Sequence, residues 1–243
     1  MRVIRFDTVT STNDLARDEQ FVHGDLLWAE EQTAGRGQRG HTWLSHKGEN
    51  LTFTLLVEPK FLPAREQFLL SEAAALALVD TLQSYHIEAT IKWTNDIYVG
   101  DRKIVGMLIE HFYGGMHLRR TLIGIGLNVN QRVFDASLPN PTSMALERHK
   151  DFDREEVAAR FATAFEARYK QLEEGQSDAL QQDYRQAMYR IGQKQLFRLP
   201  DGTEFEAEIE GVEAGGALQL RHPDGTRKSY QFKEVEFVIK KAE

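Results

Sequence analysis

Short segments rich in β-forming residues alternate with polar turns over the first quarter of the chain. Strands are predicted at residues 2–8 and 26–31, and the run NLTFTLLV at 50–57 predicts a longer strand. Ser11 and Asp14 have the spacing of a capping box, so a helix is predicted to begin at the segment STND. The strand at 26–31 runs directly into a glycine-rich loop, which is therefore expected at the end of a sheet strand.

The middle of the chain changes from helical to strand periodicity. Pro63 is predicted to open a helix that reaches about Ser84, and its centre, LLSEAAALALVDTL, is apolar on most sides, as in a helix buried deep in a core. The runs KIVGMLIEHFY at 103–113 and RTLIGIGLNVN at 120–130 predict a hairpin joined at two glycines. Two helices are then predicted, at 154–174 and 177–189.

The periodicity of the sequence changes after about Ile191 from helical to that of short strands. Short alternating segments, QLFRL, EFEAEIEGV, ALQLR and RKSYQF, are separated by Pro-Asp-Gly turns at 200–202 and 223–225. This pattern predicts a small β-barrel at residues 191–243, appended to a mixed α/β domain at residues 1–190.

Charge and composition exclude several classes of protein and site. The formal net charge of -7 disfavours a duplex-binding protein, because such proteins need a basic face. The chain has no cysteine, which excludes disulfides, thiol catalysis and thiolate zinc sites. The N-terminus lacks the apolar core of a signal peptide, and no apolar run approaches the ~20 residues that span a bilayer. We therefore expect a cytoplasmic protein with no membrane partner.

The loop QTAGRGQRG at residues 32–40 combines glycines with two arginines. Glycine loses more conformational entropy on folding than other residues, so this loop is expected to order only when a ligand offsets that loss. An anion can do so, because successive backbone N–H groups form a concave nest and arginine adds a permanent, forked charge. The loop is therefore predicted to order over phosphate or carboxylate. The alternatives are a plain surface loop and an RG-type segment that contacts RNA.

Two further segments carry side chains suited to an anionic ligand. KWTND places a cation, an amide and a carboxylate in one turn, and Asp96 with an amide oxygen is suited to magnesium; an Asx-type turn is the alternative. Lys103 is expected either to reach an active-site anion or to mark the solvated end of its strand. Gly106 leaves room for a ligand against the backbone, or else marks a bulge. GIGLNVN, at 124–130, again has small residues followed by amides.

Taken together, these segments resemble the catalytic core of biotin–protein ligases. In chain order the matching segments are STND, EEQTAGRGQRGHTW, NLTFTLLV, KWTNDIYV, KIVGMLIE, GIGLNVN and PTSM, which cover about residues 7–145. The tail segments GGALQLR and KEVEFV resemble the small C-terminal barrel of that family. The resemblance implies an α+β fold: a class II synthetase-like ligase core, with a mixed β-sheet flanked by helices, that carries a small SH3-like β-barrel.

The resemblance also implies a two-step, ATP-dependent reaction. The biotin carboxylate attacks the α-phosphate of ATP, which gives biotinyl-5′-AMP and pyrophosphate. A lysine of a biotin carboxyl carrier protein domain then attacks the activated carbonyl and releases AMP. Neither step needs a protein nucleophile, in agreement with the absence of cysteine. ATP and biotin are then the substrates, Mg²⁺ is the expected metal, and residues 1–190 form the catalytic domain.

Roles for individual residues follow from the same resemblance. The residues implied in biotin binding are Ser11, Thr12, Asn13, Gln32, Gly35, Arg36, Gly37, Gln38, Lys103 and Gly106. The residues implied in ATP binding are Arg36, Arg39, Trp43, Asn95, Lys103 and Asn128. Lys103 and Arg36 are implied as the catalytic cations, with Lys103 bridging the biotin carboxylate and the α-phosphate. Asp96 and Asn128 are implied as metal ligands.

The sequence departs from the common family pattern at three places. Gln38 stands where the family loop often has arginine, and Thr94 stands where the turn often has proline. Since Gln38 carries no charge, the adenylate is expected to be held less tightly and to leak. The biotin-site segment begins at Ser11, which leaves no room for the N-terminal helix-turn-helix domain of some relatives, so we expect no DNA partner.

Other functions remain as alternatives. They are a lipoate–protein ligase or lipoyl transferase on the same scaffold, a non-catalytic sensor of biotin or nucleotide, and an RNA-binding module that uses Arg36 and Arg39 beside Trp43. The arginine- and glycine-rich loop and KWTND favour biotin, whereas Lys103, Arg36 and Asn128 favour an enzyme over a sensor. Members of the family often form dimers through sheet edges, and the sequence leaves the choice between a monomer and a homodimer open.

Overall fold

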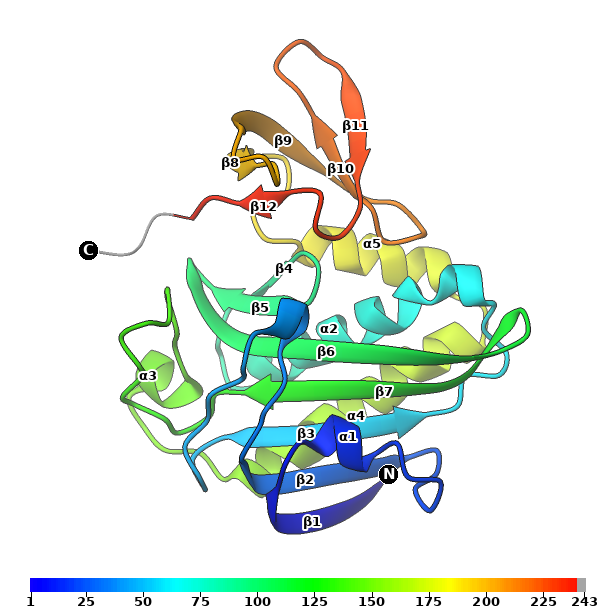
Figure 1. Ribbon diagram of the computed structural model, residues 1–243, viewed down its shortest axis with the longest axis vertical. Coiled ribbons are helices and arrows are strands. Elements are labelled where there is room, and N and C mark those ends of the chain that lie inside the picture. Colours follow the sequence, from blue (N-terminus) through cyan, green and yellow to red (C-terminus); the bar gives the residue numbers. More distant parts are fainter. Residues whose placement is uncertain (240–243) are drawn as a thin grey trace.

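The computed structural model describes residues 1–239, except for the side chain of Arg39. Its larger sheet has seven strands in the order β1-β2-β3-β7-β6-β5-β4 (Figure 1). These strands are β1 (Arg2–Val9), β2 (Asp25–Gln32), β3 (Leu51–Val57), β4 (Thr90–Lys92), β5 (Asp96–Val99), β6 (Arg102–Gly114) and β7 (His117–Leu127). Within the described residues β1 pairs with β2 in parallel and the other neighbours are antiparallel, so the predicted mixed sheet is confirmed.

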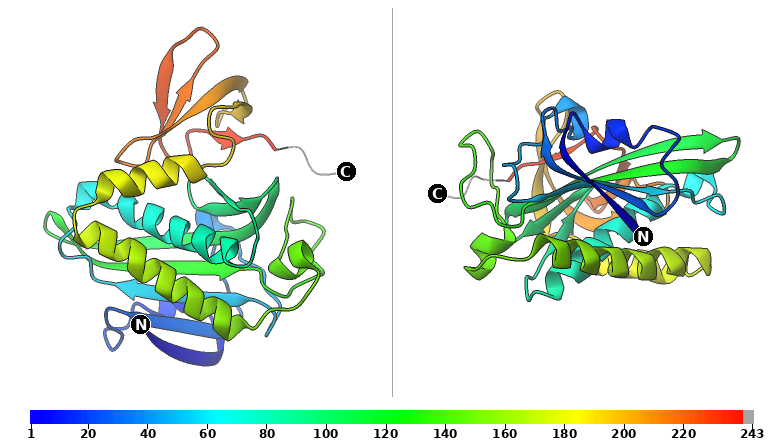
Figure 2. Two further views of the ribbon diagram at one scale, coloured as in Figure 1. Left: turned by 180° about the vertical axis from the view of Figure 1, so that it is seen from behind. Right: turned by 90° about the horizontal axis from the view of Figure 1, so that it is seen from below.

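Three helices cover one face of this sheet and enclose the main core (Figure 2). They are α2 (Phe68–Gln83), α4 (Arg154–Glu173) and α5 (Ser177–Ala187). The helix α2 is buried on nearly every side because alanines at 73–75 and 77 allow close packing against the sheet, α4 and α5. Each fully buried leucine on it, such as Leu70 or Leu78, contributes about 1.5–3 kcal/mol. The buried helix predicted from the apolar run is thus confirmed.

The opposite face is covered by α1 (Thr12–Leu15) and the turn that follows it (Figure 1). A second, smaller cluster joins this segment to the sheet, and its buried members are Ala16, Phe21, Leu27, Leu56 and Leu122. Arg120 of β7 is buried beneath the turn and donates to the backbone carbonyls of residues 17, 18 and 21. These bonds fix the end of α1 on the sheet and leave the neighbouring part of the same face open.

The predicted capping box at the start of α1 is wrong. Ser11 occupies the N-cap position, but its side chain makes no capping hydrogen bond. The residue is buried and lines the cavity described below, so it contributes to that cavity rather than to a cap of the helix. With four residues, α1 is a single turn held by the surrounding packing.

A smaller antiparallel sheet follows α5 (Figure 1). Its strands are β8 (Lys194–Arg198), β9 (Glu204–Val212), β10 (Leu218–Arg221), β11 (Arg227–Tyr230) and β12 (Glu236–Phe237), in the order β11-β10-β9-β8-β12. The Pro-Asp-Gly turns are confirmed, since Gly202 and Gly225 both take a positive φ. The sheet is consistent with an SH3-like fold, but among the described residues it stays open. The short strands β11 and β12 lie at opposite edges, so the predicted closure is not formed.

The smaller sheet packs on the larger unit through a tight turn at Gly216. Trp93 donates its indole N–H to the carbonyl oxygen of Gly216 over 2.8 Å. Gly216 has a φ of +91°, and a Cβ there would lie 2.6 Å from the ring of Phe68 on α2. Glycine is therefore required by both the backbone and the close approach. Because the two parts pack so closely, the domain boundary predicted at 190/191 remains a prediction.

Among the described residues, no helix combines the length and apolar character that crossing a membrane requires. The longest, α4, is amphipathic and carries charged residues along its exposed side.

Candidate active site

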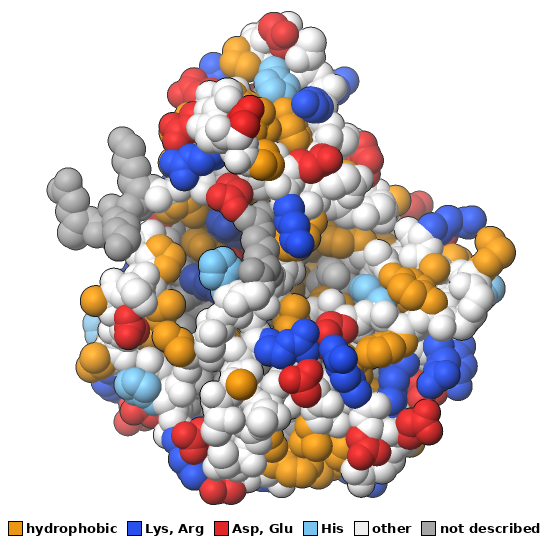
Figure 3. Space-filling view, viewed as in Figure 1, with side chains coloured by type: hydrophobic (Ala, Val, Ile, Leu, Met, Phe, Trp, Pro, Cys, Tyr) orange, Lys and Arg blue, Asp and Glu red, His pale blue; other side chains and the backbone are white. Residues whose placement is uncertain are grey.

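A cavity of about 740 Å³ opens on the uncovered face of the larger sheet, beside the C-terminal sheet. The surface is hollowed between these two parts (Figure 3). Most residues predicted for the site line this one cavity: Ser11, Thr12, Asn13, Gln32, Arg36, Gly37, Gln38, Trp43, Asn95, Asp96, Lys103, Gly106 and Asn128. Segments that are far apart in the sequence are thus brought together by α1, the glycine loop, β6 and the end of β7.

Two of the residues predicted for the site, Gly35 and Arg39, are not among the residues that line the cavity. Gly35 is buried behind the cavity wall, where its carbonyl accepts from the backbone N–H of Trp43 over 2.9 Å. A Cβ at Gly35 would lie 2.6 Å from the Trp43 carbonyl oxygen, so this glycine permits the loop to fold back on itself. The side chain of Arg39 lies outside the part of the chain that the structure describes.

Two cross-strand rows on the open sheet face form the floor of the cavity. In the first row Gly124 of β7 lies between Thr54 of β3 and Leu108 of β6. In the second row Gly126 pairs with Gly106 of β6. Because side chains alternate along a strand, both rows face the same side, and their glycines leave room above the backbone.

Asn13 of α1 fills the space above the first row. A Cβ on Gly124 would lie 2.2 Å from Asn13 Oδ1, so the amide can lie on the sheet only because residue 124 is glycine. Asn13 Nδ2 donates to the Leu108 carbonyl over 3.1 Å and to Glu110 Oε2 over 2.9 Å. The Thr54 hydroxyl lies 2.6 Å from Asn13 Oδ1. These contacts hold the amide in one orientation.

The substitution Gly124→Ala should therefore destabilise the protein. The new methyl group would overlap Asn13 Oδ1 and approach the backbone oxygen of Leu108 to 3.0 Å, which only a shift of backbone can relieve. We expect the free energy of unfolding in urea to fall by about 1–3 kcal/mol. The matched control is Gly215→Ala, where a Cβ would meet nothing within 4 Å. Equal effects of the two substitutions would contradict the packing of Asn13 on Gly124.

Thr12 and Gln32 form the next part of the floor. Gln32 Oε1 accepts from the Thr12 backbone N–H over 2.8 Å and from its hydroxyl over 3.1 Å. Ser11, Thr12 and Asn13 are each buried, so this end of the cavity is neutral, polar and shielded from water. Such a surface suits a small neutral ring that carries its own donors and acceptors.

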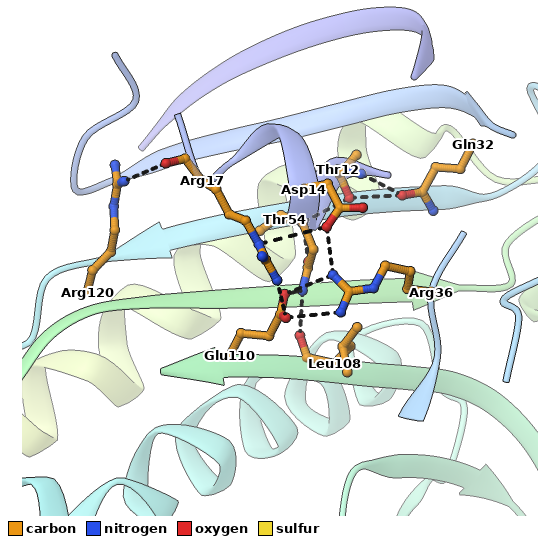
Figure 4. Close-up of polar contacts among 10 residues, drawn as sticks. Thr12, Asp14, Arg17, Gln32, Arg36, Thr54, Leu108, Glu110 and Arg120 are labelled. Carbon is orange, nitrogen blue, oxygen red and sulfur yellow. Dashed lines mark hydrogen bonds and ion pairs between the residues drawn. The ribbon is translucent and has the colours of Figure 1, made fainter. Parts of the chain in front are cut away.

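A charged cluster lies at the rim beside Asn13 and consists of Asp14, Arg17, Arg36 and Glu110 (Figure 4). Arg36, from the glycine loop, approaches Asp14 to 2.7 Å and Glu110 to 3.2 Å, while Arg17 approaches Glu110 to 2.7 Å. Burial raises the pKa of Glu110, but the Asn13 hydrogen bond and the charges of Arg36 and Arg17 outweigh it and hold that pKa below its ordinary value. Glu110 is therefore an anion that can anchor the loop arginine.

The glycine loop is folded over the cavity by its own backbone contacts and by Trp43. Gly37 N–H donates to the His41 carbonyl over 2.7 Å, next to an isolated bridge between Arg36 and Thr42. The Trp43 indole lies on the second glycine row, so that a Cβ on Gly126 would lie 2.2 Å from it. Trp43 Nε1 is buried without a hydrogen-bond partner among the described residues. Trp43 was predicted to pack over adenine, and that role stays a prediction.

Lys103 projects into the same cavity from the start of β6. Its ammonium lies 2.7 Å from Asp96 Oδ1 and 5.7 Å from the centre of the Trp43 ring. Its backbone N–H donates to the Asn140 carbonyl over 2.6 Å, and its carbonyl accepts from Thr142 over 2.9 Å, so β6 is fixed on both sides of the side chain. Arg36 and Lys103 thus line one cavity, each beside its own carboxylate.

The predicted metal ligands, Asp96 and Asn128, also line this cavity. Asn128 is held by a hydrogen bond from its Nδ2 to the Thr142 carbonyl over 2.9 Å. No group of three or more metal-binding side chains gathers among the residues that the structure describes. One carboxylate and one amide oxygen nevertheless fit magnesium, which commonly binds through few protein ligands plus water and substrate phosphate.

Several residues of the site were missed by sequence reasoning. Thr54, Leu108, Glu110 and Asp14 contact the predicted residues directly. Arg17 contacts two of these missed residues, Glu110 and Asp14. Thr54, Leu108 and Glu110 belong to segments that had been quoted for the resemblance, and their alternation with apolar neighbours gave a signal for one sheet face. Their partners, however, depend on strand register, which the sequence did not fix.

Comparison with known proteins gives consistent matches over this region. Residues 3–128 match the family model described as the biotin/lipoate A/B protein ligase family. The bifunctional ligase/repressor BirA of Bacillus subtilis (strain 168) is 30% identical, over 94% of this chain and 72% of that protein. The biotin–acetyl-CoA-carboxylase ligase of Paracoccus denitrificans is 32% identical, over 81% of this chain and 84% of that protein.

Solved structures match over nearly the whole chain. The biotin protein ligase from Aquifex aeolicus in complex with biotin and ATP superposes with a TM-score of 0.83 at 24% identity, over 97% of this chain and 98% of that chain. The biotin protein ligase from Leishmania major in complex with biotinyl-5-AMP gives a TM-score of 0.63 at 25% identity, over 94% and 98%. The architecture of the larger sheet, its helices and the smaller sheet is therefore shared.

Proposed function

The chain belongs to the biotin/lipoate A/B protein ligase family and is a ligase, and from this premise we propose that it couples biotin to a protein lysine in two steps. In the first step a biotin carboxylate oxygen bonds to the α-phosphorus of ATP and pyrophosphate leaves. In the second step the amine of a lysine on a biotin carboxyl carrier protein domain bonds to the acyl carbon and AMP leaves. The observation that carries the proposal is the gathering of the motif residues around one cavity.

The neutral floor supports biotin as the ligand. Biotin ends in a ureido ring that offers N–H donors and a carbonyl acceptor, whereas the dithiolane ring of lipoate offers neither. Ser11, Thr12, Asn13 and Gln32 provide buried hydroxyl and amide groups there. An apolar ring would leave any donor or lone pair that faces the cavity unpaired, such as the second lone pair of Asn13 Oδ1, at a cost of about 1–3 kcal/mol for each. The site therefore favours biotin over lipoate.

The cations support the adenylation step. Attack of a carboxylate on a phosphate brings two anions together, and a positioned cation lowers that barrier. Lys103 and Arg36 are each paired with a carboxylate of the protein, Asp96 and Glu110 respectively. We propose that ligand anions replace these carboxylates, so that Lys103 bridges the biotin carboxylate and the α-phosphate and Arg36 draws the loop over them. Closure of the loop would also keep water from the mixed anhydride.

Asp96 and Asn128 are proposed to hold a magnesium ion together with the nucleotide. When bound, magnesium would neutralise charge on the phosphate oxygens. Asn95 is proposed to contact the nucleotide from the KWTND turn. Its side-chain Nδ2 donates to the backbone carbonyl of Met107, and its backbone carbonyl accepts from the Met107 N–H over 2.9 Å.

The test is the reaction itself. Purified protein is incubated with magnesium, ATP and either biotin or lipoate, and exchange of labelled pyrophosphate into ATP is measured. We expect exchange with biotin, followed by AMP-forming transfer to a carrier domain and no transfer to a carrier whose acceptor lysine is replaced by arginine. Exchange with lipoate alone would assign the protein to lipoate, and binding of biotin without exchange would make it a sensor.

The uncharged Gln38 leads to a separate prediction about retention of the adenylate. Gln38 lines the cavity where the family loop often has arginine, so Gln38→Arg adds a permanent charge near the phosphate. A partly exposed charge-assisted hydrogen bond should slow release of biotinyl-5′-AMP by about three- to tenfold. Release is measured by rapid gel filtration, together with labelling of bystander proteins. The control Gln193→Arg adds the same charge at an exposed position outside the cavity. Equal release from both variants would reject this role.

A further inference from the structure

The hydroxyl of Thr54 lies between two residues of the cavity floor without lining the cavity itself. Thr54 is fully buried in β3, and its Oγ1 lies 2.6 Å from Asn13 Oδ1 and 2.8 Å from Thr12 Oγ1. A threonine hydroxyl has one proton to donate and two lone pairs to accept. The direction of each bond therefore depends on what its neighbours can offer.

The neighbours of Asn13 fix these directions. Both hydrogens of Asn13 Nδ2 are used, one on the Leu108 carbonyl and one on the Glu110 carboxylate. Both partners only accept, so the amide nitrogen must face them and Oδ1 must face Thr54. Oδ1 cannot donate, so Thr54 must donate its single proton to Asn13. The Thr12 hydroxyl also has a single proton, which it donates either to Thr54 Oγ1 or to Gln32 Oε1, and neither choice changes the bond from Thr54 to Asn13.

Asn13 consequently offers a ligand in the cavity only a hydrogen-bond acceptor and no donor. Both amide hydrogens are donated to residues of β6, whereas Oδ1 has one lone pair left in addition to the one that accepts from Thr54. Asn13 lines the cavity, so it presents a hydrogen-bond acceptor that cannot rotate into a donor. An acceptor of this kind matches a ring N–H and does not match a ring oxygen or sulfur.

We propose that Thr54 is a positioning residue for ligand recognition, which fixes Asn13 as an acceptor for an N–H of the ligand's ring. The inference rests on the proposed function, because the ureido ring of biotin supplies that N–H. Thr54 acts through Asn13 and has no contact with the cavity of its own. Its loss should therefore weaken binding of biotin and leave the nucleotide end of the cavity unchanged.

The same strand provides a matched control. Thr52 lies two residues before Thr54 on the same face of β3 and is also buried. Its hydroxyl donates to the Ala29 carbonyl over 2.8 Å, a backbone group of β2, and not to a residue of the floor. Valine at either position keeps the shape of the side chain and removes one buried hydroxyl. A general effect of hydroxyl loss in β3 would thus appear in both variants.

The experiment measures biotin-dependent pyrophosphate exchange for Thr54→Val, Thr54→Ser and Thr52→Val. We expect Thr54→Val to raise KM for biotin by about tenfold or more, with KM for ATP and kcat within about twofold of the parent. Thr54→Ser should restore KM to within about threefold, and Thr52→Val should leave it unchanged. Thr54→Ala, which removes the hydroxyl without adding a methyl group, replaces Thr54→Val if that variant does not fold.

A double-mutant cycle separates positioning from a purely structural role. If Thr54 acts through Asn13, then adding Thr54→Val to Asn13→Ala should raise KM for biotin no further than Asn13→Ala alone. Additive effects, equal effects of Thr52→Val and Thr54→Val, or an unchanged KM in Thr54→Val would each overturn the inference. Absence of biotin-dependent exchange in the parent protein would instead reject the proposed function, so the two failures are distinguishable.

Discussion

Replacing Lys103 with methionine is expected to reduce biotin-dependent pyrophosphate exchange by about 10³-fold. The ammonium is the cation proposed to face both the carboxylate and the α-phosphate, and removal of one such preorganised group commonly costs about 10²–10³ in kcat. The fold should survive, because the side chain is about one-third exposed and its ion pair is confined to Asp96 at 2.7 Å. The loss should lie in kcat for adenylate formation, measured with saturating biotin and ATP.

The neighbouring Arg102 provides the control for this change. Arg102 pairs with Glu147 over 2.9 Å and does not line the cavity, so Arg102→Met removes a cation from the same strand without touching the site. Exchange by this variant should stay within about twofold of the parent, since a surface ion pair contributes little. Exchange near the parent level in Lys103→Met, with folding checked by circular dichroism, would remove Lys103 from the proposed chemistry.

Replacing Glu72 with glutamine is expected to make the protein markedly more stable at alkaline pH. Glu72 lies in the apolar helix α2 and is 2% exposed, and its Oε2 has no hydrogen-bond partner among the described residues. Burial raises the pKa of Glu72 to about 8. Tyr184 of α5 is equally buried, and its hydroxyl also lacks a partner in that part of the chain, so it supplies no compensating charge.

The direction of the pH dependence follows from the raised pKa. The folded protein holds the Glu72 proton up to about pH 8, whereas the unfolded chain releases it near the ordinary glutamate pKa of 4.5. The contribution of the neutral carboxyl is therefore complete below the unfolded pKa and is lost as pH rises toward the folded pKa. The whole loss is on the order of 5 kcal/mol. Glutamine cannot ionise, so Glu72→Gln should not show this loss.

Urea unfolding at pH 5 and pH 8.5 measures this effect. The parent and Glu72→Gln should have similar free energies of unfolding at the lower pH and should diverge at the higher pH, where the variant is more stable. The exposed Glu88→Gln makes the same chemical change outside the core and should follow the parent at both pH values. Parallel pH profiles for the parent and Glu72→Gln would show that Glu72 is not held neutral in the fold.

Much of the fold could be predicted because its main elements are long and strongly patterned. The strand at 50–57, the hairpin of β6 and β7 and the apolar helix α2 all follow from periodicity alone. The end of α5 was predicted two residues late, because a tertiary contact sets it: Tyr189 N–H donates to the Ile91 carbonyl of β4 over 2.8 Å. A small barrel was predicted at the C-terminal end, and among the described residues its sheet is open, with β11 and the two-residue β12 at opposite edges.

Only those residues of the candidate site that stand in recognisable sequence motifs could be predicted. Lys103, Arg36 and Asn128 were identified because they stand in short segments that resemble a known family. Thr54 and Glu110 were missed because their importance depends on which strands lie side by side. No local pattern indicates that Thr54 lies beside Gly124, and strand register is set by packing of the whole sheet.

The position of Trp43 gives the protein an optical reporter of its own active site. Trp28 is 1% exposed, belongs to the main core and does not line the cavity, so its fluorescence should respond little to ligands. Trp93 is 6% exposed but also lines the cavity, so Trp93→Phe would be used to isolate the signal of Trp43. Trp43, the third tryptophan of the chain, rests on paired glycines beneath the cation of Lys103. Any ligand that lifts it toward solvent should shift the emission maximum to longer wavelength, whereas stacking on adenine should quench it. Stopped-flow emission could therefore time the loop directly, without a label.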